Sequence, residues 1–308
     1  MEEHVIPARN TIHLLPAQEM DLSRIRQSPP GLVLVIGKTA SMRTAFLEWL
    51  VDDLSKDAHI RLSVIALPDG FSAPSECLVP VPPRGDRLLS GLRYALDADP
   101  DQIVLDLVEG QEDPELSRLA TDAARWGIGV WAGVQGTDPA RTLSRLVASC
   151  LDRITPSTNG VLRGIICLRE LPRLCRSCAA PPRDRARRDA LTRLLGDAAP
   201  GAYSRGPGCA LCNLGIDGAE ALVEICPILS GHDMSAPAED WDTLRANWLR
   251  TGGVCHLRHA LWHVGQGRGD LAGVREVFGP LKATQNTLQI LLRQVKDDLA
   301  ATTKDDPS

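Results

Sequence analysis

Short apolar segments alternate with amphipathic segments through the first half of the chain, and this alternation constrains the possible fold more than any other feature. The apolar segments predict strands at 32–36, 60–67, 103–108 and 128–134. The segments between and after them predict helices at 44–54, 88–96, 115–126 and 139–151. Strands that are apolar throughout indicate a parallel sheet covered by helices on both faces. We therefore predict an α/β domain over residues 29–160.

Charge and hydropathy exclude several classes of protein. The 308 residues carry a formal net charge of −5, which argues against a protein that binds nucleic acid through the phosphate backbone. The longest apolar runs are far shorter than the ~18 residues that span a bilayer. The first ten residues have neither the basic start nor the apolar run of a secretory signal. We expect a cytoplasmic protein without direct membrane insertion.

Four of the nine cysteines form two CxxC pairs, Cys175 with Cys178 and Cys209 with Cys212. In a reducing compartment such pairs are typical metal ligands, and four thiolates satisfy tetrahedral Zn²⁺. A redox dithiol is the alternative for a single pair, and four thiols without a metal are the other alternative. We predict a structural zinc site, which would fold its own segment, 161–226, instead of performing chemistry.

The remaining segments predict helices with different surroundings. An arginine-rich stretch at 183–193 predicts a solvated helix, and residues 241–279 have helical apolar spacing. Residues 281–299 form an amphipathic helix that packs either on its own domain or on a partner. We expect five parts: an amino-terminal remnant or linker (1–28), the α/β core (29–160), the zinc subdomain (161–226), a helical carboxy-terminal subdomain (227–280), and the amphipathic helix with its tail (281–308).

The turn after the first predicted strand has the position of a phosphate-binding loop. There, backbone N–H groups at a helix N-terminus surround an anion. Compared with GxxxxGK[ST], the first glycine and the last threonine are present, but methionine replaces the second glycine and arginine replaces the lysine. Both changes remove features that suit phosphate: a backbone without Cβ and a compact ammonium group. The candidate nucleotide-binding residues are Gly37, Lys38, Thr39, Ala40, Ser41, Met42, Arg43 and Thr44.

Over residues 22–280 the chain resembles the carboxy-terminal half of the hexameric type II secretion and type IV pilus assembly ATPases. The resemblance rests on stretches at 29–37, 90–101, 137–146 and 215–225, and on the two cysteine pairs between the last two. It implies a RecA-like P-loop NTPase core with a tetracysteine zinc-binding insert and a small helical carboxy-terminal region. It also implies that relatives carry an amino-terminal domain, forming half of the nucleotide cleft, to which only about 28 residues correspond here.

The departures from the family pattern fall on the residues that would handle nucleotide. The Walker B strand of the family ends in Gly-Glu, where this chain has Asp106 and Leu107, and only Asp106 or Glu109 could substitute for the carboxylate. The family's Glu-Asp-Pro segment corresponds to residues 66–69, of which Asp69 alone is acidic. The family's catalytic-site histidine corresponds to Gln135, which cannot transfer a proton near neutral pH. These losses argue against ATP and Mg²⁺ as functional cofactors and against assigning any catalytic residue.

Three hypotheses follow. The first is a catalytically degenerate ATPase domain that works by binding, as an accessory, regulatory or assembly subunit of a type II secretion or type IV pilus-like machine. Its partner would be an ATPase paralogue or the inner-membrane platform protein, in a homo- or hetero-oligomer, with peripheral location at the inner membrane. The second is a divergent active ATPase using Arg43, Thr44 and a relocated carboxylate. The third is a free-standing zinc-binding interaction protein.

Overall fold

The computed structural model describes residues 12–65, 71–80, 87–107, 114–149, 161–196, 202–228, 237–280 and 285–302. The chain divides into two compact units. Unit 1 comprises Met1–Leu15, Arg169–Val223 and Val254–Ser308, and unit 2 comprises Pro16–Leu168 and Glu224–Gly253. Within the described ranges, no helix is both long enough and apolar enough to cross a membrane.

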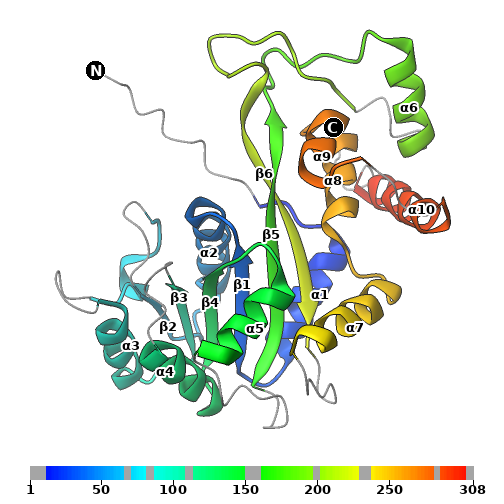
Figure 1. The fold of residues 1–308 in the computed structure, drawn as a ribbon. Coiled ribbons are helices and arrows are strands. Elements are labelled where there is room, and N and C mark those ends of the chain that lie inside the picture. Colours follow the sequence, from blue (N-terminus) through cyan, green and yellow to red (C-terminus); the bar gives the residue numbers. More distant parts are fainter. Residues whose placement is uncertain are drawn as a thin grey trace. The chain divides into compact units, whose positions relative to one another are not determined.

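Unit 2 contains the predicted alternation of strands and helices (Figure 1). Its elements are α1 (Pro16–Gln27), β1 (Leu32–Gly37), α2 (Ala40–Leu54), β2 (Leu62–Ile65), the 3₁₀ turn η1 (Ser75–Cys77), α3 (Arg87–Asp97), β3 (Gln102–Leu107), α4 (Pro114–Arg125), β4 (Gly129–Gln135), α5 (Pro139–Ser149) and α7 (Pro237–Arg250). The boundary with unit 1 falls within β5 (Leu162–Leu174) and β6 (Ile216–Pro227).

The described strands form one sheet in the order β2-β3-β4-β1-β5-β6. The β1–β4, β1–β5, β2–β3 and β3–β4 pairs are all parallel. Because β1 lies between β4 and β5, the turn that follows it opens at the carboxyl end of a central strand. This is the position at which open parallel sheets bind their ligands.

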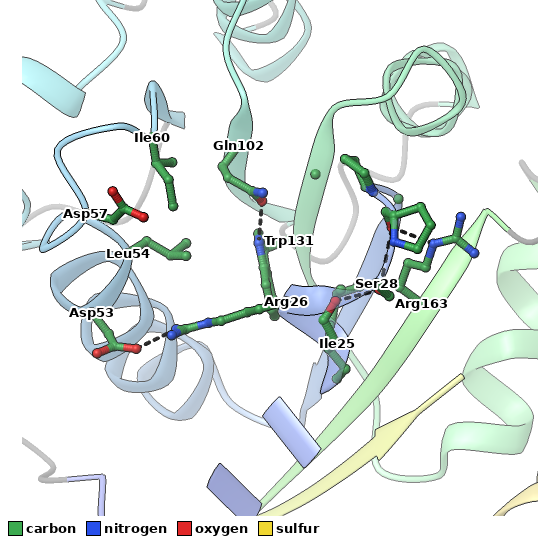
Figure 2. Close-up of a pocket in the computed structure, with 15 residues that line it drawn as sticks. Ile25, Arg26, Ser28, Asp53, Leu54, Asp57, Ile60, Gln102, Trp131 and Arg163 are labelled. Atoms are coloured by element: carbon green, nitrogen blue, oxygen red, sulfur yellow. Dashed lines mark hydrogen bonds and ion pairs between the residues drawn. The ribbon is translucent and has the colours of Figure 1, made fainter. Parts of the chain in front are cut away.

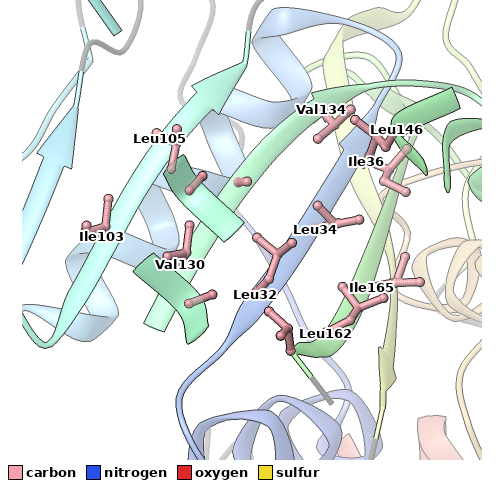
Figure 3. Close-up of a cluster of buried hydrophobic side chains, with 14 of the residues drawn as sticks. Leu32, Leu34, Ile36, Ile103, Leu105, Val130, Val134, Leu146, Leu162 and Ile165 are labelled. Atoms are coloured by element: carbon pink, nitrogen blue, oxygen red, sulfur yellow. The ribbon is translucent and has the colours of Figure 1, made fainter. Parts of the chain in front are cut away.

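Both faces of this sheet are covered, as the continuous apolar strands predict. Leu32, Leu34 and Ile36 of β1 belong to a buried cluster that includes side chains of α3, α4, α5 and α7 (Figure 3). The fully buried Phe46 and Leu47 of α2 lie outside that cluster, and α2 packs on β1, β3 and β4. The α/β fold class is therefore confirmed.

Two elements of unit 2 differ from the sequence prediction. Helix α2 begins at Ala40 instead of residue 44, so it includes more than half of the Gly37–Thr44 segment that was expected to be a turn. Residues 16–27 form α1, where no helix was predicted, with Leu22 and Ile25 buried. Ile25 packs over Gly164 of β5, which has no Cβ in the way. The remaining predicted strands and helices agree to within a few residues at each end.

Unit 1 holds the predicted arginine-rich helix as α6 (Arg185–Leu195), together with α8 (His256–Gly265), α9 (Leu271–Phe278) and α10 (Gln285–Thr302). Helix α6 starts at the N-cap Asp184 and ends at Gly196, whose φ of 60° favours glycine. The amphipathic helix α10 packs on α8 within the unit, and its Val295 and Leu299 are buried. Residues 281–284, which begin the predicted helix, lie outside the described ranges.

Candidate nucleotide turn and tetracysteine centre

The turn at Gly37–Thr44 is closed by the early start of α2. Thr39 caps the helix: its Oγ1 accepts the N–H of Met42 at 3.3 Å, and its carbonyl accepts the N–H of Arg43 at 3.4 Å. Only Lys38 and Thr39 separate β1 from α2. A phosphate-binding loop needs backbone N–H groups that are free to face an anion. Here, two of those N–H groups are already bonded within the helix.

Arg43, at the position of the P-loop lysine, points into the domain. Its Nε donates to Asp106 Oδ1 at 2.8 Å and its Nη2 donates to Oδ2 at 3.2 Å. Its Nη1 donates to the carbonyl of Gly37 at 3.0 Å. Both charged side chains are almost fully buried, with side-chain exposures of 2% and 1%. The guanidinium is therefore held by a fork-shaped pair, the geometry that arginine forms best with a carboxylate.

The carboxylate of Asp106 sits in space that a glycine provides. Asp106 lies near the end of β3, in register with Gly133 of β4, and a Cβ on Gly133 would collide with Asp106 Oδ1. Burial raises the pKa of Asp106 above its ordinary value, although the hydrogen bonds from Arg43 act against that shift. The neighbouring Leu107, at the family's glutamate position, ends β3. Glu109, the other possible substitute, lies outside the described residues, as does the 66–69 segment.

The other predicted residues of this turn have ordinary helix-start environments. Met42 is buried, and its Sδ would lie 3.5 Å from a Cβ on Gly37. Thr39 Oγ1 and Ser41 Oγ lie 3.1 Å apart, and Lys38 is exposed.

Gln135 ends β4 beside Gly37 in the register, and its carbonyl accepts a hydrogen bond from Arg145 Nη2 at 2.6 Å. The structure thus gathers the predicted turn, Asp106 and Gln135 at one end of the sheet. The Arg43–Asp106 pair itself was not predicted.

The four predicted metal ligands come together in unit 1. Their sulfur atoms all lie within 4.8 Å of one another, and this is the metal-ligand group that the described residues form. The Sγ–Sγ distances are 3.7 Å for Cys175–Cys209, 3.6 Å for Cys178–Cys212 and 3.5 Å for Cys209–Cys212. A tetrahedron with metal–sulfur bonds of ~2.3 Å has sulfur–sulfur edges of about 3.8 Å. The cluster could therefore hold a metal ion.

Local structure positions both CxxC segments, which we call the first knuckle (175–178) and the second knuckle (209–212). Cys175 donates its backbone N–H to the carbonyl of Gly215, which ties the first knuckle to the end of the second. Burial and the Cys212 thiol raise the pKa of Cys178 to about 12. Burial would also raise the pKa of Cys212, but hydrogen bonds from Cys209 lower it to about 7. A bound cation would favour the thiolate form of all four groups.

Comparison with known proteins identifies the family. The family described as Type II/IV secretion system protein matches residues 4–275. The chain is 29% identical to the protein transport protein HofB homolog of Escherichia coli K12 over 224 residues, which are 71% of this chain and 46% of that protein. It is 35% identical to the type IV pilus retractation ATPase PilT of Pseudomonas aeruginosa PAO1 over 128 residues, 40% of this chain and 36% of that protein. The chain spans less than half the length of these relatives.

A solved structure supports the fold. The X-ray structure of the Legionella pneumophila ATPase DotB superposes with a TM-score of 0.56 at 17% identity, covering 84% of this chain and 62% of that one. At this identity the likeness shows the shared fold alone. The resemblance drawn from the sequence motifs is confirmed by the match over residues 4–275, and the chain belongs to the type II/IV secretion system protein family.

Proposed function

We propose that this chain is a catalytically degenerate member of the family, a pseudo-ATPase that acts by binding as an accessory, regulatory or assembly subunit of a type II secretion or type IV pilus-like machine. The observation that carries the proposal is the buried Arg43–Asp106 pair. It joins the P-loop lysine position to the Walker B strand, which in an active enzyme would serve the phosphates and the magnesium ion.

The residues of the turn do not fit a magnesium nucleotide. A phosphate at this site would need the Arg43 guanidinium, but that group already donates to Asp106 and to the carbonyl of Gly37. Freeing it would leave Asp106 buried and unpaired, at a cost of several kcal/mol. Binding a phosphate through the backbone N–H groups of Met42 and Arg43 would also break their hydrogen bonds to Thr39, which caps α2. Met42 adds a side chain where close approach of a phosphate requires glycine.

We also propose that the tetracysteine centre binds Zn²⁺ as a structural ion. The fit of the sulfur–sulfur distances to a tetrahedron supports this, and four thiolates with no open position favour a structural over a catalytic role. Cys175, Cys178, Cys209 and Cys212 would hold the metal. The metal ion would stabilise the fold of the β5–β6 connection. It would take no part in a reaction.

The family supports a proposal for the partner and the location. Family members carry the description of a secretion system protein, and one relative is described as a pilus ATPase. We propose a cytoplasmic protein placed at the inner membrane by its partner, either an ATPase paralogue or the membrane platform protein. In that complex it would contribute a folded surface and leave ATP hydrolysis to the partner.

Titration of the zinc-loaded protein with ATP and Mg²⁺ tests the proposal. By isothermal calorimetry we expect no binding tighter than millimolar, together with no phosphate release above background. A dissociation constant in the low micromolar range, or turnover that disappears in Thr44→Ala, would overturn it in favour of an active ATPase.

Two variants show whether the turn causes the loss. Met42→Gly with Arg43→Lys restores the P-loop residues, and we expect it to gain measurable nucleotide binding without turnover, because Leu107 still replaces the family glutamate. The matched control is Lys38→Arg with Ser41→Gly, which alters two exposed residues of the same turn and should leave binding absent. Equal binding by both variants would contradict the role assigned to Met42 and Arg43.

A further inference from the structure

The two knuckles of the tetracysteine centre differ in their access to solvent. In the first knuckle Cys175 is 1% exposed and Cys178 is partly buried. In the second knuckle Cys212 is partly buried but Cys209 is exposed, which no other cysteine among the described residues is. The two residues between Cys209 and Cys212 are exposed as well. A small reagent dissolved in water therefore meets the sulfur of Cys209 first.

Backbone contacts hold the first knuckle and cover part of it. Cys175 donates its N–H to the carbonyl of Gly215 at 2.9 Å. Gly206 lies directly against Cys178: a Cβ on this glycine would come within 2.0 Å of the Cys178 carbonyl oxygen and within 2.8 Å of its Sγ. These contacts do not involve a metal ion, and they leave less room for a reagent at the first knuckle than at the second.

The second knuckle is folded on itself. Cys212 donates its N–H to the carbonyl of Cys209 at 3.3 Å, and Asn213 and Ile216 exchange two backbone hydrogen bonds of 2.9 Å. The Sγ atoms of Cys209 and Cys212 lie 3.5 Å apart. A disulfide bond is about 2.05 Å long, so the two sulfur atoms need to approach by only about 1.5 Å. They can form a disulfide within the knuckle.

We propose that Cys209 and Cys212 form a reversible oxidation site, at which a hydroperoxide converts the two thiolates to a disulfide and the centre loses its metal ion. This inference rests on the zinc centre proposed above. Zn²⁺ has no redox chemistry, so the electrons come from the sulfur atoms. After the oxidation only Cys175 and Cys178 remain as ligands, too few for a closed tetrahedral site.

The oxidation balances at these two side chains. The Cys209 thiolate attacks one oxygen of the hydroperoxide, the O–O bond breaks, and Cys209 becomes a sulfenic acid. The Cys212 thiolate then attacks the Cys209 sulfur and displaces hydroxide, which leaves the disulfide. Each sulfur atom gives up one electron and the hydroperoxide takes up both, while the displaced oxygen anions gain protons from water. A thiol reductant reverses the change by exchange, so in a reducing compartment the disulfide is transient.

The recess in unit 2 has no part in this chemistry. Its lining, shown in Figure 2, balances Arg26 and Arg163 against Asp53 and Asp57 and includes no cysteine among the described residues. Cys77, the partly exposed thiol that the structure describes in unit 2, lies outside this lining. Its oxidation therefore serves as a reference for a thiol that belongs to neither the metal centre nor the recess.

Treatment of the full zinc-loaded chain with hydrogen peroxide tests the proposal. A chromogenic chelator follows the release of zinc, and alkylation with mass spectrometry identifies the oxidised cysteines. At low conversion we expect zinc release to accompany a Cys209–Cys212 disulfide, with Cys175 and Cys178 recovered as free thiols. Dithiothreitol with added Zn²⁺ should restore the centre. Cys77→Ser, the control, should release zinc at the wild-type rate.

Two histidine variants separate the knuckles. Histidine is also a ligand of structural zinc, so Cys209→His and Cys178→His both leave a Cys₃His set that can hold the metal. Cys209→His removes the exposed sulfur and should release zinc at least about 10-fold more slowly than the wild type. Cys178→His keeps the exposed pair and should release zinc as fast as the wild type. Equal rates in the two variants, or a first disulfide that includes Cys175 or Cys178, would overturn the proposal.

Zinc analysis before the oxidant is added distinguishes failure of the metal centre from failure of the oxidation site. A chain that holds no zinc contradicts both proposals. A zinc-loaded chain that keeps its metal while Cys77 is fully oxidised contradicts the oxidation site alone and leaves the structural ion as proposed.

Discussion

Gly133 and Asp106 face each other across the β3–β4 pair, and the carboxylate of Asp106 occupies the space that a Cβ on Gly133 would fill. The absence of one side chain thus makes room for a buried ion pair. We expect Gly133→Ala to push the carboxylate away from Arg43 and to destabilise the protein by about 2–4 kcal/mol. Urea denaturation measures this loss, and a change below about 0.5 kcal/mol would contradict the steric argument.

The pair itself should respond asymmetrically to substitution. Asp106→Leu leaves Arg43 buried without its carboxylate, so we expect a loss of about 3–5 kcal/mol. The double variant Arg43→Met with Asp106→Leu removes both charges and should recover most of that loss, because two apolar side chains need no partner. Unfolding curves of both variants and the wild type test this, and equal losses in the single and double variants would count against the pair as the cause.

Metal removal should act on unit 1. Cys209→Ser removes one of four ligands, and we expect zinc content to fall and hydrogen exchange to speed up in the β5–β6 connection, with unit 2 less affected. Cys77→Ser is the control and should retain one zinc per chain, since Cys77 lies in unit 2 and is not one of the four clustered cysteines. Full zinc occupancy in Cys209→Ser would remove Cys209 from the ligand set.

Acid should weaken unit 1 through His259, which is fully buried, and His13, which is half-buried. Burial lowers the pKa of His259 to about 3 and that of His13 to about 4. In the unfolded chain both protonate near 6.5, so the unfolded state takes up protons first as the pH falls. Stability should therefore decrease from about pH 6.5 downward, by at most ~1.4 kcal/mol per pH unit for each group.

His259→Gln separates this effect from acid release of the metal. The histidine accepts the N–H of Val223 at its Nδ1, and its Nε2 lies 2.9 Å from the carbonyl of His13. A glutamine can accept and donate in the same way without taking up a proton. We expect the free energy of unfolding of the variant to depend less steeply on pH between about pH 6.5 and pH 4. The difference in slope should correspond to about one fewer proton taken up on unfolding. An unchanged slope would assign the acid sensitivity to other groups.

The sequence predicted what depends on spacing and periodicity. The parallel sheet was predictable because its strands are apolar at the positions that face both sides of the sheet. The cysteine cluster was predictable because each of the two CxxC pairs directs both of its sulfur atoms to one point. The early start of α2 was also readable: Thr39 before Ala40 is an N-cap signal, but the family pattern assigned the same residues to a loop.

Long-range relations could not be read in the same way. Arg43 and Asp106 are 63 residues apart, and their contact depends on the strand register that sets Asp106 opposite Gly133. The sequence indicated that arginine replaces the P-loop lysine and that the Walker B carboxylate is displaced. It did not indicate that Arg43 and Asp106 form an ion pair. Likewise, nothing in the spacing of the three histidines of α8 indicated that His259 would bridge the backbone of Val223 and that of His13.

The last prediction concerns the amphipathic helix, for which the sequence left two roles open. In α10, Leu299 packs over Gly265 of α8, Asp298 pairs with Arg258 at 2.7 Å, and Thr302 accepts Trp262 Nε1 at 3.1 Å. These contacts favour internal packing, so we expect Leu299→Ala to cost about 2–4 kcal/mol through the cavity it creates. Ile290→Ala, on the exposed side of the same helix, should change stability by less than about 0.5 kcal/mol. Thermal and urea unfolding of the two variants compare these values, and a Leu299→Ala protein as stable as Ile290→Ala would return α10 to the role of a partner-binding helix.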